Sequence, residues 1–345
     1  MKVKYRSKIF LTAFLAACLM TQGSQAFAQK RQEFVPMGTA VGIQMFTDGA
    51  LVVGLSGTEN GAAPSPAALA GLLPGDLITE LGGEKIESAA DLKLAISSLK
   101  DETVEIKVLR KGEAVTLELC PYLGSGEAEI GLWLRDNVAG IGTLTFFDPQ
   151  TGLYGGLGHG INDVDTGVLL PLGRGSILKS SITGIIKGCP GSPGELSGAF
   201  DTSGIWGSIT MNTYCGIFGQ LDGSVMPSAK AIPVANENEI ELGEATILSN
   251  TSGEEVEEFR VEITRVYKGD NEGRSLMLCV KDEGLLERTG GIVQGMSGSP
   301  IIQNGMLIGA VTHVMVNDPS KGFGVSIENM MAAASRENTF IDSAA

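Results

Sequence analysis

Beyond residue 120, hydrophobic and polar positions alternate in short runs. Examples are IGLWLRD, AGIGTLTFFD, SITGIIKG and GIWGSIT, which begin at residues 130, 139, 181 and 204. An apolar residue at every second position is typical of a strand with one buried face. The one long helical pattern in this part, IENMMAAASRE, begins at residue 327. Residues 121–345 are therefore predicted to form a β-barrel or a β-sandwich.

A different pattern covers residues 35–120. Strand-like runs lead to the turn ALAGLLPGDLI, and a helix follows with Ser88 as its expected N-cap. Two strands, VEIKVLR and AVTLEL, are then joined at Lys111 and Gly112. One face of the helix is apolar and consists of Leu92, Ala95, Ile96 and Leu99. Short strands around a single amphipathic helix predict a small α+β domain.

This pattern resembles a PDZ domain of the kind attached to exported proteases, and AGLLPGDLI at residues 70–78 is its most specific part. The resemblance places that family's carboxylate-binding loop at Ala40, Val41, Gly42 and Ile43. Backbone N–H groups in such a loop hold the end of a peptide that adds a strand to the sheet edge. The resemblance therefore implies a peptide ligand for this region.

Composition supports a β-rich chain and excludes one class of partner. The 345 residues include 48 glycines without a regular period, which indicates many turns between short strands. The formal net charge is −15, and no basic run follows the N-terminus. Phosphate backbones are bound by concentrated positive charge, so no nucleic-acid partner is expected.

The N-terminus has the form of an export signal. Basic residues precede the apolar stretch IFLTAFLAACLM, and an A-x-A-like cleavage motif, Ala-Phe-Ala, follows at residues 26–28. The apolar stretch is shorter than the roughly 20 residues needed to span a bilayer, so a cleaved signal peptide over residues 1–28 is the first interpretation. Retention as a membrane anchor is the second, and lipoprotein processing at Cys18 is the third. All three predict an exported protein.

Four cysteines follow the signal segment, at positions 120, 189, 215 and 279. They have no C-x-x-C spacing, so neither a zinc knuckle nor a thioredoxin-type site is expected. Export permits disulfides, and Cys189 with Cys215 is the first candidate pair. Buried thiols are an equally good interpretation.

The stretch Gly295 to Pro300, GMSGSP, carries a serine between glycines directly before an apolar run. It resembles the Gly-Asp-Ser-Gly-Gly-Pro signature of chymotrypsin-like serine proteases, which fold as two β-barrels. Aligning the two makes Ser297, not Ser299, the expected nucleophile. The oxyanion-hole donors would be the backbone N–H groups of Gly295 and Ser297. Asn304-Gly305 then predicts a type I′ hairpin.

A serine hydroxyl needs a base, and the chain has two histidines. His159 lies among glycines in YGGLGHGI, far upstream of the serine, as a base from a first barrel would be. His313 lies on the strand after the serine hairpin. We therefore expect His159 to be the base and His313 to form part of the substrate wall. A structural histidine bonded to the backbone is the alternative for each.

Three segments together indicate a more specific family. They are GGLGHGINDVDTG at residues 155–167, residues 290–330, and the PDZ-like domain after an apolar N-terminus. The chain is similar to the stage IV sporulation protein B family, PDZ-bearing serine peptidases of endospore-forming bacteria. The resemblance implies an endopeptidase exported into the space between the forespore membranes. There it would cleave a membrane-associated signalling partner and its own chain, leading to activation of the late mother-cell sigma factor.

The resemblances differ on which carboxylate orients His159. Chymotrypsin-like order and spacing favour Asp201, whereas the sporulation family places its acidic residue at the position of Asp282, so we choose Asp282.

Asp163 and Asp165 follow the histidine, but the other ligands of a calcium loop are missing, so we expect a turn and no cofactor. A PDZ adaptor on a catalytically silent protease scaffold is the alternative to an enzyme.

Overall fold

The computed structural model describes residues 31–57, 65–124, 128–223, 225, 229–269 and 273–341. The predicted export segment, residues 1–28, lies outside these ranges. Within them, no helix combines the length and the apolar character that a membrane span requires. Every helix and strand below belongs to the unit Glu33–Ala345.

The chain is mainly β, and its peptidase part is a chymotrypsin-like pair of barrels. The first is a ring of strands closed because β2 pairs with both β11 and β9. Around the ring the strands are β2 (Ala40–Leu55), β9 (Leu132–Phe147), β10 (Leu153–Gly156), β13 (Gly216–Leu221), β12 (Glu195–Thr213) and β11 (Arg174–Ile186). Short strands β1 (Glu33–Pro36) and β14 (Ile232–Pro233) extend its edge beside β9.

The second barrel is closed along the whole of its ring. Its strands are β15 (Gly243–Ser252), β16 (Glu255–Val266), β17 (Leu276–Val280), β20 (Lys321–Ser326), β19 (Met306–Val314) and β18 (Pro300–Gln303). The predicted hairpin between β18 and β19 is confirmed, because Asn304 and Gly305 both have positive φ, 52° and 73°. The predicted C-terminal helix is α5 (Ile327–Ile341), and a 3-10 turn, η2, covers Glu237–Glu239.

The PDZ domain is built from the segment between β2 and β9. Its elements are α2 (Pro66–Ala70), β3 (Leu77–Leu81), β4 (Glu84–Lys85), α3 (Ala89–Ser97), β5 (Val104–Arg110), β6 (Glu113–Leu119), β7 (Tyr122–Leu123) and β8 (Ala128–Glu129). The predicted N-cap of α3 is confirmed, since Ser88 Oγ accepts a hydrogen bond from the Asp91 N–H. Leu92 and Ala95 of the predicted apolar face are buried in the domain core.

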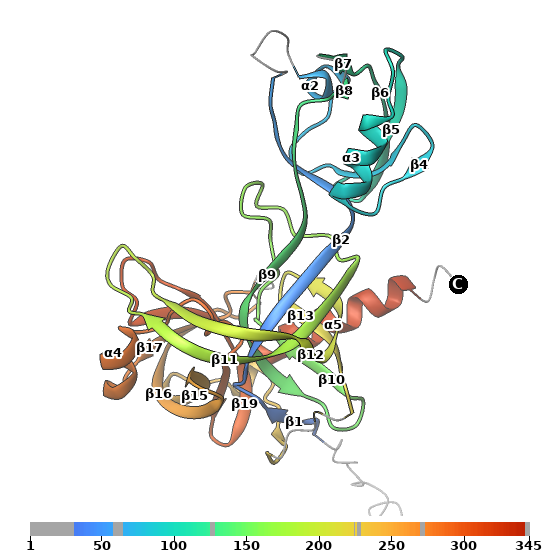
Figure 1. The fold of residues 1–345 in the computed structure, drawn as a ribbon. Coiled ribbons are helices and arrows are strands. Elements are labelled where there is room, and N and C mark those ends of the chain that lie inside the picture. Colours follow the sequence, from blue (N-terminus) through green and yellow to red (C-terminus); the bar gives the residue numbers. More distant parts are fainter. Residues whose placement is uncertain are drawn as a thin grey trace, which may run out of the picture. The chain divides into compact units, whose positions relative to one another are not determined.

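Two long strands, β2 and β9, run from the first barrel into the PDZ domain (Figure 1). In the barrel, Ala40–Phe46 pair with β9 on one side, and Val41–Phe46 pair with β11 on the other. Farther along β2, Ala50 and Leu51 pair with the PDZ strand β3. The PDZ domain is thus inserted into the first barrel. The sequence pattern placed the residues before position 47 in the PDZ domain, but the structure uses them as strands of the barrel.

This arrangement corrects the predicted carboxylate-binding loop. Ala40, Val41, Gly42 and Ile43 form the barrel half of β2, with strands on both sides of most of it. Their backbone groups are used by the sheet, and all four are buried. Gly42 is needed because an added Cβ would lie 2.6 Å from the Phe200 side chain. A peptide end therefore cannot dock on these amides.

A short helix, α4 (Glu283–Thr289), begins directly after Asp282. No disulfide joins the four cysteines after the signal segment: Cys189 is exposed and Cys215 is buried. The candidate pair Cys189–Cys215 is therefore not formed.

Candidate active site

The turn that carries Ser297 is shaped by two glycines. Gly295 and Gly298 have φ of 94° and 99°, a region that favours glycine. A Cβ on Gly298 would lie 1.9 Å from the carbonyl oxygen of Thr143, so no larger residue fits. The N–H of Thr143 donates to the Ser297 carbonyl at 3.0 Å. A turn directly before β18 of the second barrel is thereby fixed to β9 of the first.

The two serines of the motif lie in different environments. Ser299 is 0% exposed, and its Oγ is one of the few buried side-chain oxygens of the described residues that lack a hydrogen-bond partner. Ser297 is half-buried and lines a cavity. Its Oγ donates to the carbonyl oxygen of Thr312 at 2.5 Å. Of the two hydroxyls, only that of Ser297 can meet a substrate.

Two amides beside Ser297 are available for a ligand. Neither the Gly295 N–H nor the Ser297 N–H is a donor in any hydrogen bond found within the described ranges. The amides that alternate with them are used, since Met296 donates to Val293 O at 3.2 Å and Gly298 donates to Val311 O at 2.7 Å. Unpaired N–H groups at alternate positions around a serine are the geometry of an oxyanion hole.

His159 follows a tight turn after β10. Leu157 and Gly158 have φ of 65° and 70°, and a Cβ on Gly158 would meet Thr312 Cγ2 at 2.9 Å. His159 Nδ1 lies 2.8 Å from the carbonyl oxygen of Gly160. A carbonyl oxygen only accepts, so Nδ1 carries the proton and Nε2 keeps its lone pair. Burial lowers the pKa of His159 despite this hydrogen bond, so the ring is neutral at pH 7.

A cavity of 480 Å³ brings the predicted residues together. His159, Ser297, Gly295 and His313 all line it, and no Asp, Glu, Lys or Arg of the described residues does. Its apolar walls include Ile43, Val138, Ile141, Ile161, Val293 and Val314. The site therefore suits an uncharged peptide segment.

His313 faces the same cavity, and its ring centroid lies 4.9 Å from that of His159, with the rings tilted by 38°. Burial, followed by the nearby charges of His159 and Arg274, lowers the pKa of His313 to about 4. His313 is therefore neutral at pH 7 and fits the predicted role of substrate wall.

The structure does not bring either candidate carboxylate to His159. Asp282 is the N-cap of α4, where its Oδ1 accepts from the Leu285 N–H at 3.0 Å. Asp201 lies on β12, exposed, and binds the backbone N–H and hydroxyl of Ser203. Neither lines the cavity. The ring nitrogen that an orienting carboxylate would hold is occupied instead by the Gly160 carbonyl.

Some residues of the site gave no signal in the sequence. Thr312 acts through its backbone carbonyl, which any residue type supplies, and nothing in the strand pattern distinguishes Thr143 from its neighbours. Asn212 on β12 is buried, and its amide group binds the N–H and carbonyl of Ile161 and the carbonyl of Leu170. A lone asparagine in the apolar run SITMNTYCGIFG was the one available hint of this anchor.

Comparisons with known proteins agree with this architecture. Residues 43–120 match the PDZ domain family, and residues 126–331 match the family described as SpoIVB peptidase S55. A stretch of 79 residues is 33% identical to a putative zinc metalloprotease from Mesorhizobium japonicum, covering 23% of this chain and 22% of that protein. The chain thus spans less than a quarter of that relative's length.

Two solved structures are also similar. The PDZ domain of an SdrC-like protein from Listeria monocytogenes is 29% identical over 25% of this chain and 87% of that chain, with a TM-score of 0.21. The Rv3671c protease from M. tuberculosis, in its active form, is 13% identical over 58% of this chain and 74% of that chain, with a TM-score of 0.31.

The family match decides the class of protein. It covers the histidine turn, the serine turn and most of both barrels. The protein is a serine peptidase with a PDZ domain. Since the match extends over more than half of the sequence, the chain belongs to the SpoIVB peptidase S55 family.

Proposed function

We propose that Ser297 is the nucleophile of an endopeptidase and His159 is its general base. The observation that carries this proposal is that both residues line one uncharged cavity beside two unused amides. Ser297 Oγ attacks the scissile carbonyl carbon while His159 Nε2 takes the hydroxyl proton. The oxyanion accepts hydrogen bonds from the Gly295 and Ser297 N–H groups. His159 then returns the proton to the leaving amine, and water hydrolyses the acyl-enzyme.

The hydrogen bond from Ser297 Oγ to Thr312 is part of this mechanism. In the absence of substrate the hydroxyl donates to the Thr312 carbonyl oxygen. Before attack, rotation about χ1 of Ser297 must transfer this hydrogen bond from Thr312 O to His159 Nε2. Staggered χ1 positions of serine differ little in energy, so substrate binding can supply the change.

We propose that the catalytic unit is a Ser-His dyad. Gly160 O fixes the imidazole tautomer, which is one task of the carboxylate in a triad. A neutral carbonyl stabilises the imidazolium less than a carboxylate would. The base is therefore weaker than in a triad, and burial lowers the pKa of His159 further.

The family membership and the N-terminal sequence support a physiological role. In this role the peptidase is exported into the space between the forespore membranes, retained there or released according to the fate of residues 1–28. It cleaves a membrane-associated signalling partner and its own chain during endospore formation. This cleavage leads to activation of the late mother-cell sigma factor, with the PDZ domain binding a peptide ligand.

The proposed substrate is tested in sporulating cells of the source organism. Strains carrying the wild-type chain or Ser297→Ala are compared for membrane proteins cleaved only in the wild type. A partner cut in a Ser297-dependent manner supports the signalling role. Identical cleavage patterns in both strains, at equal protein levels, would contradict it.

A further inference from the structure

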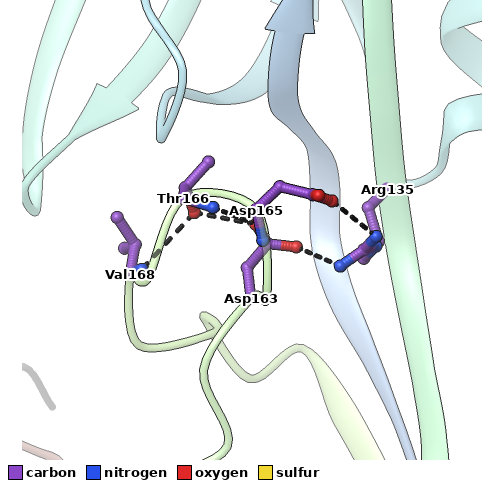
Figure 2. Close-up of polar contacts among 5 residues, drawn as sticks. All are labelled: Arg135, Asp163, Asp165, Thr166 and Val168. Atoms are coloured by element: carbon purple, nitrogen blue, oxygen red, sulfur yellow. Dashed lines mark hydrogen bonds and ion pairs between the residues drawn. The ribbon is translucent and has the colours of Figure 1, made fainter.

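Arg135 on β9 binds two carboxylates of the loop that follows His159 (Figure 2). Its Nη1 lies 2.5 Å from Asp163 Oδ2, and its Nη2 lies 2.8 Å from Asp165 Oδ2. The Asp163 side chain is 0% exposed and that of Arg135 is 29% exposed. A guanidinium that spans two carboxylates fixes geometry more strictly than an ammonium, because its donors lie in one plane.

The loop is organised around Asp163. Its Oδ1 accepts hydrogen bonds from the Asp165 N–H, the Thr166 N–H and the Thr166 hydroxyl, at 3.1, 2.8 and 2.8 Å, which makes the predicted turn. Burial disfavours the charge, but these hydrogen bonds and Arg135 outweigh it and hold the pKa of Asp163 below its usual value. Asp163 is therefore ionised, and loss of Arg135 leaves a buried charge without its partner.

This loop is part of the active site. Asp163 is four residues after His159, and the intervening Ile161 and Asn162 line the catalytic cavity. Asn212 holds the two ends of the loop, at Ile161 and Leu170. Arg135 holds the segment between those ends. The two anchors together determine where the wall beside His159 lies.

The strand that carries Arg135 is itself fixed at this point. Successive side chains of a strand point to opposite faces. The next residue, Asp136, accepts a hydrogen bond at 2.9 Å from the N–H of Ala89, the first residue of α3. Arg135 therefore reaches the loop from a strand that is tied to the PDZ helix.

We propose that Arg135 is a positioning residue of the peptidase, which holds the loop after His159 in its catalytic position against strand β9. This inference rests on the proposed role of His159 as the base. Arg135 touches neither the nucleophile nor the cavity, so its effect passes through Asp163 and Asp165.

The test uses the full chain and a short uncharged peptide that does not need the PDZ domain. Arg135→Gln is expected to lower kcat by about 10-fold to 100-fold, because small displacements of a catalytic group cost this much. KM changes little. Arg135→Lys recovers part of kcat because it keeps one ion pair. Asp165→Asn, on the exposed carboxylate, has a smaller effect and adds nothing to Arg135→Gln.

Arg110→Gln is the matched control. Arg110 is also 29% exposed and pairs with a buried carboxylate, that of Asp76, but within the PDZ domain. It is expected to leave kcat on the short peptide unchanged. If folded Arg135→Gln has wild-type kcat while His159→Ala is inactive, the positioning role of Arg135 is wrong but the proposed role of His159 stands. Wild-type activity in His159→Ala would overturn the proposed base instead. Should Arg135→Gln fail to fold, additive effects of Arg135→Lys and Asp165→Asn would overturn the inference.

Discussion

The hydroxyl of Thr143 donates a hydrogen bond to the carbonyl oxygen of Gly295 at 2.7 Å. Thr143 lies on β9 of the first barrel, and Gly295 begins the serine turn directly before β18 of the second. With the Thr143 N–H bound to the Ser297 carbonyl, this residue holds the turn at both ends of the Gly295–Ser297 segment. The orientation of the oxyanion-hole amides therefore depends on a side chain that is distant in sequence.

Thr143→Val tests this dependence. Valine matches the shape of threonine but lacks the donor, so the half-buried Gly295 carbonyl loses its partner at a cost of about 1 kcal/mol in stability. We expect kcat to fall while KM is nearly unchanged, as measured on a short peptide. Thr143→Ser keeps the hydroxyl and is the control. Equal kcat for the valine and serine variants would show that the hydroxyl does not support the turn.

Substitutions at Asp282 distinguish a helix cap from a catalytic carboxylate. Asparagine caps helices as well as aspartate does, whereas alanine loses about 1 kcal/mol. We therefore expect Asp282→Asn to keep both stability and turnover, and Asp282→Ala to lower the unfolding free energy measured by urea denaturation. A folded Asp282→Asn enzyme with turnover reduced about 10⁴-fold would identify Asp282 as the orienting carboxylate of a triad.

The pH profile of kcat/KM reports the pKa of the free base. Because burial lowers the pKa of His159, its neutral, active form persists below pH 6.5. Activity is then lost only as the pH falls through this lowered pKa, so the acidic limb has its midpoint below pH 6.5. A carboxylate beside the ring would raise the pKa instead. A midpoint above 6.5 in the pH titration would therefore contradict the dyad.

The insertion of the PDZ domain predicts which deletions fold. Ser56 donates to the Gly131 carbonyl at 3.1 Å, so the chain enters and leaves the domain at neighbouring points. Joining Ser56 to Gly131 through Asn-Gly, a two-residue hairpin turn, is expected to preserve the barrels and hydrolysis of a short peptide. Deleting residues 35–120 removes β2 and half of β1 and is expected to unfold the first barrel. Circular dichroism and peptide hydrolysis compare the two, and activity in the larger deletion would contradict the barrel assignment.

Much of this architecture was predictable because local chemistry determines it. The turn at Asn304 and Gly305, the cap at Ser88 and the alternation of the barrel strands depend on neighbours in sequence. The glycines around Ser297 and His159 also marked tight turns correctly. These signals do not require knowledge of which strands pair.

The rest depended on pairing between distant segments. The apolar run Ala40–Ile43 suits a PDZ domain and a barrel strand equally, and only pairing with β9 and β11 distinguishes them. Asp282 was chosen on the family resemblance, and the helix that it caps has only seven residues, too short a pattern to mark Asp282 as an N-cap from the sequence. The Gly160 carbonyl could not be predicted, since every residue has one.

The most direct test of the account is labelling with a peptide phosphonate that reacts with activated serines. We expect one phosphonate per wild-type chain, located at Ser297 by mass spectrometry of proteolytic fragments. Ser299→Ala is expected to label at the same site, and His159→Ala to label far more slowly because no base removes the proton. Absence of label on the folded wild-type protein, or label at Ser299, would contradict the assignment of Ser297 and His159 as the catalytic pair.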